Sequence, residues 1–183
     1  MPRSIALALG VAALSLIVAV VAYGALHKSS LKNPEDSLTT AIPPKAMRGP
    51  APQFSGPTIT GGHVSLAQFH GRPLLVTFFA SWCPPCKQDA PRIAALARNY
   101  GSRIHIVGID GGDTRTGAHK FLARYGWRFP ILWDPDNNQY AAFGVAAQPT
   151  TFVIDGQGKL VERFLGPINP AVAQRVIGRL LAT

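Results

Sequence analysis

Cysteine is scarce in this chain of 183 residues, which contains only two. Two cysteines cannot build the several bridges of a small secreted disulfide scaffold, and they fall short of the four ligands of a Cys-rich structural zinc site. Charge is scarce too, since charged side chains make up 15% of the sequence and hydrophobic ones 47%. This composition excludes an intrinsically disordered chain, which requires low hydrophobicity and high charge. The length suits one ordinary domain with an appendage.

Acidic residues are few, because nine Asp and Glu stand against 18 Lys and Arg, for a net charge of +9. The basic residues of the C-terminal part are scattered over 72–179 without a run or interleaved aromatic residues, so nucleic-acid binding is not predicted. They indicate a solvated surface or, as a weaker interpretation, attraction to anionic lipid headgroups. The five histidines show no ligand spacing. We therefore expect no metal and no cofactor.

Residues 5–26 form an uncharged, apolar run of 22 residues. A helix of that length covers roughly 33 Å, enough for the hydrocarbon core of about 30 Å. The alternative is a cleaved signal peptide with Ala22-Tyr23-Gly24 at the cleavage site, but the apolar run is longer than that pattern has. The sequence therefore predicts a membrane anchor over residues 1–26, which contacts the bilayer through residues 5–26. Both interpretations send the rest of the chain out of the cytoplasm if the short N-terminus stays inside.

Residues 27–50 change abruptly in composition and are polar, rich in Ser, Thr and Pro, and without helical or strand periodicity. We interpret them as a flexible tether on the periplasmic side. Residues 51–183 then form the single predicted domain.

Strand and helix patterns alternate along this domain, which predicts an α/β fold with a mainly parallel sheet, covered on both faces and carrying an antiparallel hairpin at one side. The expected strands are 58–60, 63–66, 74–80, 103–110, 129–133, 150–155 and 159–165. The expected helices are 84–100, one from Asp113 or Thr114 to about 126, 139–143 and one from Pro170 onward.

Both cysteines lie in one Cys83-Pro84-Pro85-Cys86 sequence, at the end of an apolar strand and the start of a helix. Unpaired N–H groups and partial positive charge at a helix N-terminus stabilise a thiolate and lower its pKa. We expect Cys83, at the exposed end, to be the nucleophile and Cys86, about one turn further in, to resolve the mixed disulfide. The alternatives are a structural disulfide, a zinc site without its second ligand pair, and haem attachment, for which Lys87 replaces the required His.

Several segments carry a resemblance to a known family. They are LLVTFFASWCPPCK (74–87), Pro91, the segment 148–155 with its Pro-Thr-Thr-Phe, and the following Gly156-x-Gly158. With these, the domain resembles thioredoxin-fold proteins of the TlpA/ResA type, and among them the membrane-tethered DsbE-type thiol–disulfide interchange proteins of cytochrome c maturation. The resemblance implies a thioredoxin-like mixed central sheet with helices on both faces and an extra N-terminal β-hairpin, preceded here by one transmembrane helix.

The resemblance also implies a reductase role for a redox-active Cys83–Cys86 disulfide. Its substrate would be a disulfide of apocytochrome c or of a partner in that pathway, and a membrane thiol reductase would supply the electrons. The location implied is the bacterial inner membrane, with the catalytic domain on the periplasmic side.

Three further positions are candidates for substrate binding. The family's proline in the Pro-Thr-Thr-Phe segment is cis, which predicts a cis Gln148–Pro149 bond, and a proline is the residue that permits one. If Pro149 faces the dithiol, the backbone of Gln148 can pair with an extended substrate as an added strand. The other interpretation of Pro149 is an ordinary strand start. Trp82 forms either core or, as we favour, a flat surface beside the disulfide.

Asp89 lies three residues after Cys86, so both can share one helix face. A carboxylate there would raise the pKa of the Cys86 thiol and could accept its proton, whereas the alternative is a solvated helix charge. The family usually has Glu at this place, and thioredoxin's buried Asp on the preceding strand is here Thr77. Pro84 and Pro85 remove two N–H donors near the Cys83 sulfur, from which we expect a less depressed Cys83 pKa and a reducing dithiol.

Other functions remain open at this stage. A peroxiredoxin shares the fold, but Val76 and Ala80 occupy the Pro and Thr places of its P-x-x-x-T-x-x-C motif. A general periplasmic reductase or an oxidase of other substrates would use the same dithiol. A tethered module that binds unfolded polypeptide along Gln148 and Pro149 without turnover is the non-enzymatic alternative.

Overall fold

The computed structural model describes residues 44–182. The predicted anchor and residues 27–43 of the predicted tether lie outside these residues. Within 44–182, no helix is long and apolar enough to cross a membrane.

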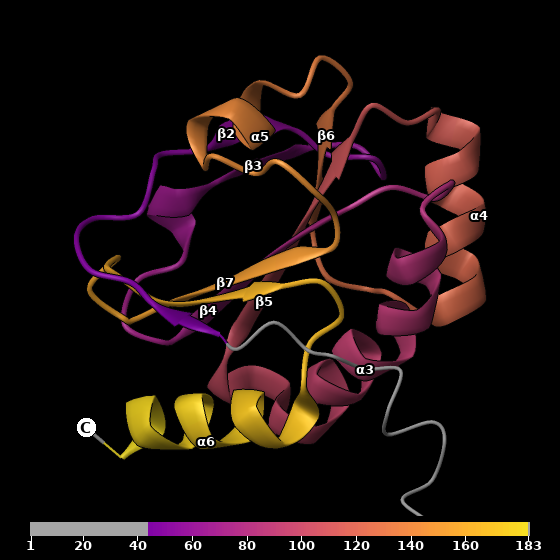
Figure 1. Ribbon diagram of the computed structural model, residues 1–183. Helices are drawn as coiled ribbons and strands as arrows, with labels where there is room; N and C mark the ends of the chain where they lie inside the picture. Colours follow the sequence, from indigo (N-terminus) through magenta and orange to yellow (C-terminus); the bar gives the residue numbers. More distant parts are fainter. Residues whose placement is uncertain (1–43, 183) are drawn as a thin grey trace, which may run out of the picture. The chain divides into compact units, whose positions relative to one another are not determined.

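A six-stranded mixed sheet organises the domain, in the order β1-β8-β7-β4-β5-β6 (Figure 1). Its strands are β1 (Lys45–Ala46), β4 (Leu74–Phe79), β5 (His105–Gly111), β6 (Ile131–Asp134), β7 (Thr150–Ile154) and β8 (Leu160–Leu165). β4, β5 and β6 run parallel, whereas the β4–β7, β7–β8 and β8–β1 pairs are antiparallel. The thioredoxin-like mixed sheet is confirmed, and the expectation of a mainly parallel sheet is wrong because the β7–β8 hairpin pairs with the central strand β4.

Two hydrophobic cores lie on the two faces of this sheet. One contains side chains of α3 (Pro84–Tyr100), α4 (Arg115–Tyr125) and α6 (Pro170–Leu181), and the other those of α5 (Asn138–Ala142) and β3 (His63–Ser65) (Figure 1). All six residues of β4 are buried, and they alternate between the cores: Leu75 and Phe79 contribute to the first, Val76 and Phe78 to the second. This explains why β4 has an unbroken apolar sequence, as a strand covered on both faces must.

The N-terminal hairpin differs from its prediction. β2 (Ser55–Pro57) pairs with β3 in a separate two-stranded sheet, so the expected strand over 58–60 is wrong. Thr58 instead closes the turn, because its N–H donates to the Gly62 carbonyl and its hydroxyl to the Gly61 carbonyl. Gly61 and Gly62 both have a positive φ, which an ordinary residue rarely adopts. Residues 66–68 form a short 3₁₀ helix, η1 (Leu66–Gln68), and another, η2 (Gly101–Arg103), follows α3.

The domain begins before residue 51. Lys45 and Ala46 form β1 and pair with Arg163 and Glu162 of β8, and Pro50 makes a further bridge to Lys159. The boundary predicted between tether and domain therefore falls inside the folded domain. A two-residue strand has no periodicity that a sequence pattern could reveal, and its pairing is with residues more than 100 positions away.

Candidate active site

The two cysteines lie where β4 leads into α3. Cys83 is the N-cap of α3, and its sulfur accepts a hydrogen bond from the Cys86 N–H at 3.1 Å. Pro84 and Pro85 fill the first two helical positions and carry no N–H, so Cys86 is the first residue of the helix that can donate. The cysteines form a disulfide with a Cα–Cα distance of 5.3 Å, and the structure is that of the oxidised protein.

Both cysteine side chains are buried in this oxidised form. The exposed fraction is 3% for Cys83 and 2% for Cys86, so the expectation of an exposed Cys83 is not met here. The carbonyl oxygen of Gln148 lies 3.7 Å from the Cys83 sulfur. A disulfide sulfur has no proton, and this is a van der Waals contact that a reduced thiol could turn into a hydrogen bond.

The Gln148–Pro149 peptide bond is cis, as the family resemblance predicts, and it lies beside the disulfide. The Tyr140 hydroxyl is 2.7 Å from the Gln148 side-chain Oε1 and 2.9 Å from the Phe79 carbonyl oxygen. These contacts attach the loop before Pro149 to the end of β4. The Gln148 backbone is thereby held against Cys83, where a substrate disulfide must arrive.

Trp82 is exposed rather than part of the core. Its exposed fraction is 59%, which makes it the exposed large hydrophobic residue of the described chain. Its indole N–H donates to the Gly112 carbonyl at 3.1 Å, so the ring is fixed although it faces solvent. A groove of about 490 Å³ adjoins it, and the groove is lined by Trp82, Gly111, Gly112, Asn137, Tyr140, Val145, Ala146, Ala147 and Gln148. This space can hold a polypeptide segment beside Cys83.

Asp89 is a buried carboxyl group on α3, so the alternative of a solvated helix charge is excluded. Its exposed fraction is 2%, and its Oδ1 accepts a hydrogen bond from the Ile168 N–H at 2.8 Å. Its Oδ2 has no hydrogen-bond partner among the described residues. Burial raises the pKa of Asp89 to about 6, although the Ile168 N–H and the charge of Arg92 oppose the rise. A carboxylate with this pKa is ionised at neutral pH and retains a free lone pair for a proton.

Thr77 takes no part in acid–base chemistry. It is buried under the helices, and its hydroxyl oxygen accepts a hydrogen bond from the Thr151 hydroxyl at 3.1 Å. Asp89, on the helix that begins at the dithiol, is therefore the candidate proton acceptor of the two positions.

A clamp that the sequence does not predict holds the residues before Cys83. Asp113, expected only as a possible helix cap, accepts hydrogen bonds from the Ser81 N–H, the Ser81 hydroxyl and the Thr114 N–H. Thr114 is the actual N-cap of α4. The neighbouring Asp110 is fully buried, and burial, followed by the charge of Asp113, raises its pKa to about 8. No local pattern predicts this pairing, because Ser81 and Asp113 are 32 residues apart.

A thioredoxin-like sheet, a Cys-x-x-Cys pair at the N-terminus of a long helix and a cis-proline peptide beside it together define a thioredoxin-like thiol–disulfide oxidoreductase. Comparison with known sequences agrees with this class. The profile of the AhpC/TSA family matches residues 47–163, and the chain belongs to this family.

Its relatives are thiol–disulfide proteins. The chain is 35% identical over 144 residues to the thiol:disulfide interchange protein DsbE of Allochromatium vinosum, covering 77% of this chain and 78% of the relative. It is 30% identical over 123 residues to the thiol-disulfide oxidoreductase ResA of Bacillus subtilis, covering 67% and 69%. The crystal structure of a putative DsbE from Chlorobium tepidum superposes with a TM-score of 0.65 at 30% identity, covering 74% of this chain and 96% of that one. The chain is thus a DsbE/ResA-type thiol–disulfide oxidoreductase.

Proposed function

We propose that this enzyme is a membrane-anchored reductase of protein disulfides outside the cytoplasm, and that its substrate is apocytochrome c or a partner in cytochrome c maturation. The observation that carries the proposal is the groove beside Cys83, in which exposed Trp82 and the Gln148 carbonyl flank the disulfide. A groove of about 490 Å³ has room for a polypeptide segment. The names of the DsbE and ResA relatives support the choice of a disulfide substrate.

The reaction transfers two electrons from the dithiol to the substrate. The Cys83 thiolate attacks one sulfur of the substrate disulfide, which forms a mixed disulfide and releases one substrate thiolate. Cys86 then gives its proton to the Asp89 carboxylate and attacks the Cys83 sulfur. This step releases the second substrate sulfur as a thiolate, which takes up a proton, and leaves the Cys83–Cys86 disulfide.

The prolines at the start of α3 support the reducing direction of the proposal. A thiolate at a helix N-cap is normally stabilised by N–H groups of the second and third helical positions. Here only the Cys86 N–H donates to the Cys83 sulfur, because Pro85 has none. A less stabilised thiolate makes the dithiol a better electron donor.

The anchor and the electron donor complete the proposal. The apolar residues 5–26 would hold the enzyme at the inner membrane, with the catalytic domain on the periplasmic side. A membrane thiol reductase would return the two electrons to the Cys83–Cys86 disulfide after each cycle.

Trapping and redox titration test this proposal on the full-length chain. Cys86→Ser should accumulate a mixed disulfide with a disulfide-bonded apocytochrome c peptide, seen by mass spectrometry, whereas Cys83→Ser should form none. Equilibration with glutathione should give a reduction potential near that of thioredoxin, about −270 mV. A potential near −120 mV would identify an oxidase and refute the reductase assignment.

A further inference from the structure

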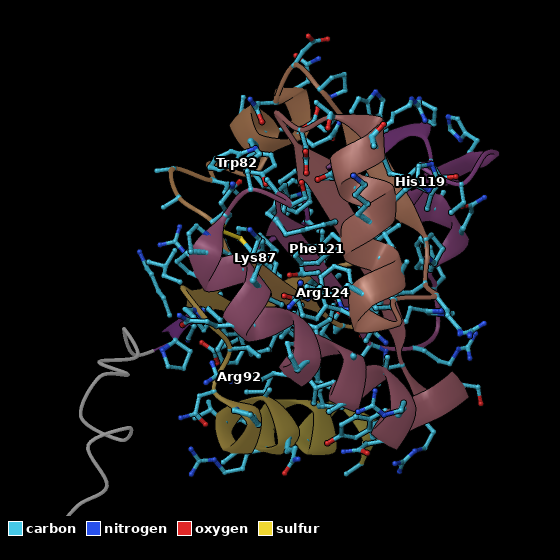
Figure 2. All side chains as sticks on the ribbon, turned by 90° about the vertical axis from the view of Figure 1, so that its right-hand side faces the viewer. Trp82, Lys87, Arg92, His119, Phe121 and Arg124 are labelled. Carbon is cyan, nitrogen blue, oxygen red and sulfur yellow. A yellow bond between two sulfur atoms is a disulfide. The ribbon has the colours of Figure 1, made fainter. Side chains whose placement is uncertain are left out.

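A second groove, of about 450 Å³, runs between α3 and α4. It is lined by Ser81, Lys87, Gly117, Lys120, Phe121, Arg124 and Tyr125. Figure 2 looks onto this face, with Lys87 on α3 beside the disulfide and with Phe121 and Arg124 following on α4. We call it the α3–α4 groove.

The sequence of α4 places its share of this groove on one stripe. Positions 117, 120, 121, 124 and 125 follow the spacing of three and four residues that brings helical side chains onto one face. Phe121 is buried and Tyr125 half-buried, so they give the groove an apolar floor. Exposed Lys120 and Arg124 line it on the α4 side.

The basic side chains of the α3–α4 groove have no acidic partner. Within residues 44–182, neither Lys87 nor Lys120 nor Arg124 forms an ion pair. The Arg124 guanidinium lies over the Tyr125 ring, 5.8 Å from its centroid. Asp113, the carboxylate of the clamp on Ser81, already accepts three hydrogen bonds from Ser81 and Thr114.

The acids of the domain contribute little negative charge to its surface. Residues 44–182 contain seven Asp and Glu against 15 Lys and Arg. Four of the seven are buried, namely Asp89, Asp110, Asp134 and Glu162. The positive charge at the α3–α4 groove is therefore available to an external anion rather than neutralised within the fold.

The position of the α3–α4 groove selects a polypeptide among anionic partners. One end lies at Ser81, two residues before Cys83, and Lys87 directly follows Cys86. A substrate whose disulfide reaches Cys83 must lay its flanking residues on the surface around α3. An apolar floor between basic side chains suits a segment with both apolar and acidic residues, whereas lipid headgroups would need no floor of this kind.

From this geometry we infer that the α3–α4 groove binds an acidic segment of the substrate polypeptide next to its disulfide. Lys120 and Arg124 are the specificity-determining residues, and Phe121 and Tyr125 accept an apolar side chain of the segment. The inference deepens the proposed reductase function and rests on it, since it names the chemistry of the polypeptide that the reductase prefers.

Two fluorescein-labelled, cysteine-free peptides test the binding on the full-length chain. They share one apolar sequence and differ only in four Glu or four Gln. By fluorescence anisotropy in 50 mM salt, the Glu peptide should bind about tenfold more tightly, and 500 mM salt should remove most of this preference. Lys120→Gln/Arg124→Gln should reduce the preference about fivefold. The matched control Arg175→Gln/Arg179→Gln, which removes the same charge from exposed positions of α6, should keep it.

Equal affinity for both peptides, or an equal loss of preference in the α6 control, would overturn the inference. A lipid-binding experiment gives the other outcome that would overturn the inference. If Lys120→Gln/Arg124→Gln weakens binding of the protein to phosphatidylglycerol vesicles, but not to phosphatidylcholine vesicles, and leaves the peptide preference unchanged, the groove binds lipid instead. Reduction of disulfide versions of both peptides separates the two proposals. If wild type and Lys120→Gln/Arg124→Gln reduce the Gln peptide at the same rate, the redox centre of the variant is intact. If the enzyme reduces neither peptide, the reductase function is refuted instead.

Discussion

Asp89→Asn should make the enzyme slower and, at neutral pH, more stable. Asparagine has the same shape and can still accept the Ile168 N–H, but it cannot take a proton from Cys86. Proton acceptors of this kind contribute on the order of a hundredfold to a rate, and the mixed disulfide should live about 100 times longer in the variant.

The stability gain follows from the burial of Asp89. Its pKa in the folded protein, about 6, lies above its ordinary 3.8, so the folded state holds the proton more tightly than the unfolded state. The free energy of unfolding of the wild type therefore falls as the pH rises from about 4 to about 6, and it stays low above that range. The two pKa values correspond to a penalty of about 3 kcal/mol on the ionised form. Between pH 4 and pH 7, the advantage of Asp89→Asn over wild type should grow by about 2 kcal/mol.

Urea unfolding of the oxidised proteins at several pH values measures this difference. Asp136→Asn, at an exposed turn position, is the matched control and should run parallel to wild type at every pH. The resolution rate comes from a stopped reaction, in which the mixed disulfide is separated and quantified. If the Asp89→Asn advantage does not change with pH, Asp89 is not ionised at a cost inside the fold, and the reasoning fails.

Two further substitutions test the redox direction and the substrate groove. Pro85→Ala restores an N–H to the second position of α3, and one more hydrogen bond to the Cys83 thiolate, worth about 1 kcal/mol, should raise the reduction potential by about 20 mV, measured against glutathione. An unchanged or lower potential would contradict the explanation from the prolines. Trp82→Ala removes a largely exposed ring, so the melting temperature should hardly change while KM for a disulfide peptide rises about fivefold and kcat stays. An equal loss of activity toward oxidised glutathione would show that Trp82 acts on the dithiol rather than on the peptide.

The sequence predicts best those features that local chemistry determines. The apolar run of β4 and the helix start at Cys83-Pro84-Pro85-Cys86 lie where they were expected, because strand burial and proline at a helix start are local properties. The cis bond before Pro149 was predicted through resemblance, and the residues alone would have favoured an ordinary strand start.

Features that depend on distant contacts escaped prediction. The clamp of Asp113 on Ser81 joins two loops that only the parallel pairing of β4 and β5 brings together. The burial of Asp89 likewise depends on the loop before α6, since its hydrogen-bond donor is Ile168. The sequence showed that Asp89 could share a face with Cys86, but the same spacing fits a solvated charge equally well.

The N-terminal segment of the domain touches both edges of the large sheet. β1 pairs with β8 at one edge, while at the other Thr58 bridges to Leu132 and the Ile59 N–H donates to the Ile131 carbonyl of β6. Unpaired strand edges are templates on which other extended chains aggregate. Under the proposed function, the substrate is a polypeptide that has not yet folded, so the enzyme meets such extended chains at every turnover. The domain occupies part of both edges with its own backbone, which limits unproductive strand pairing there. Under the proposed function, this leaves the loop at Gln148 as the place where an extended substrate docks.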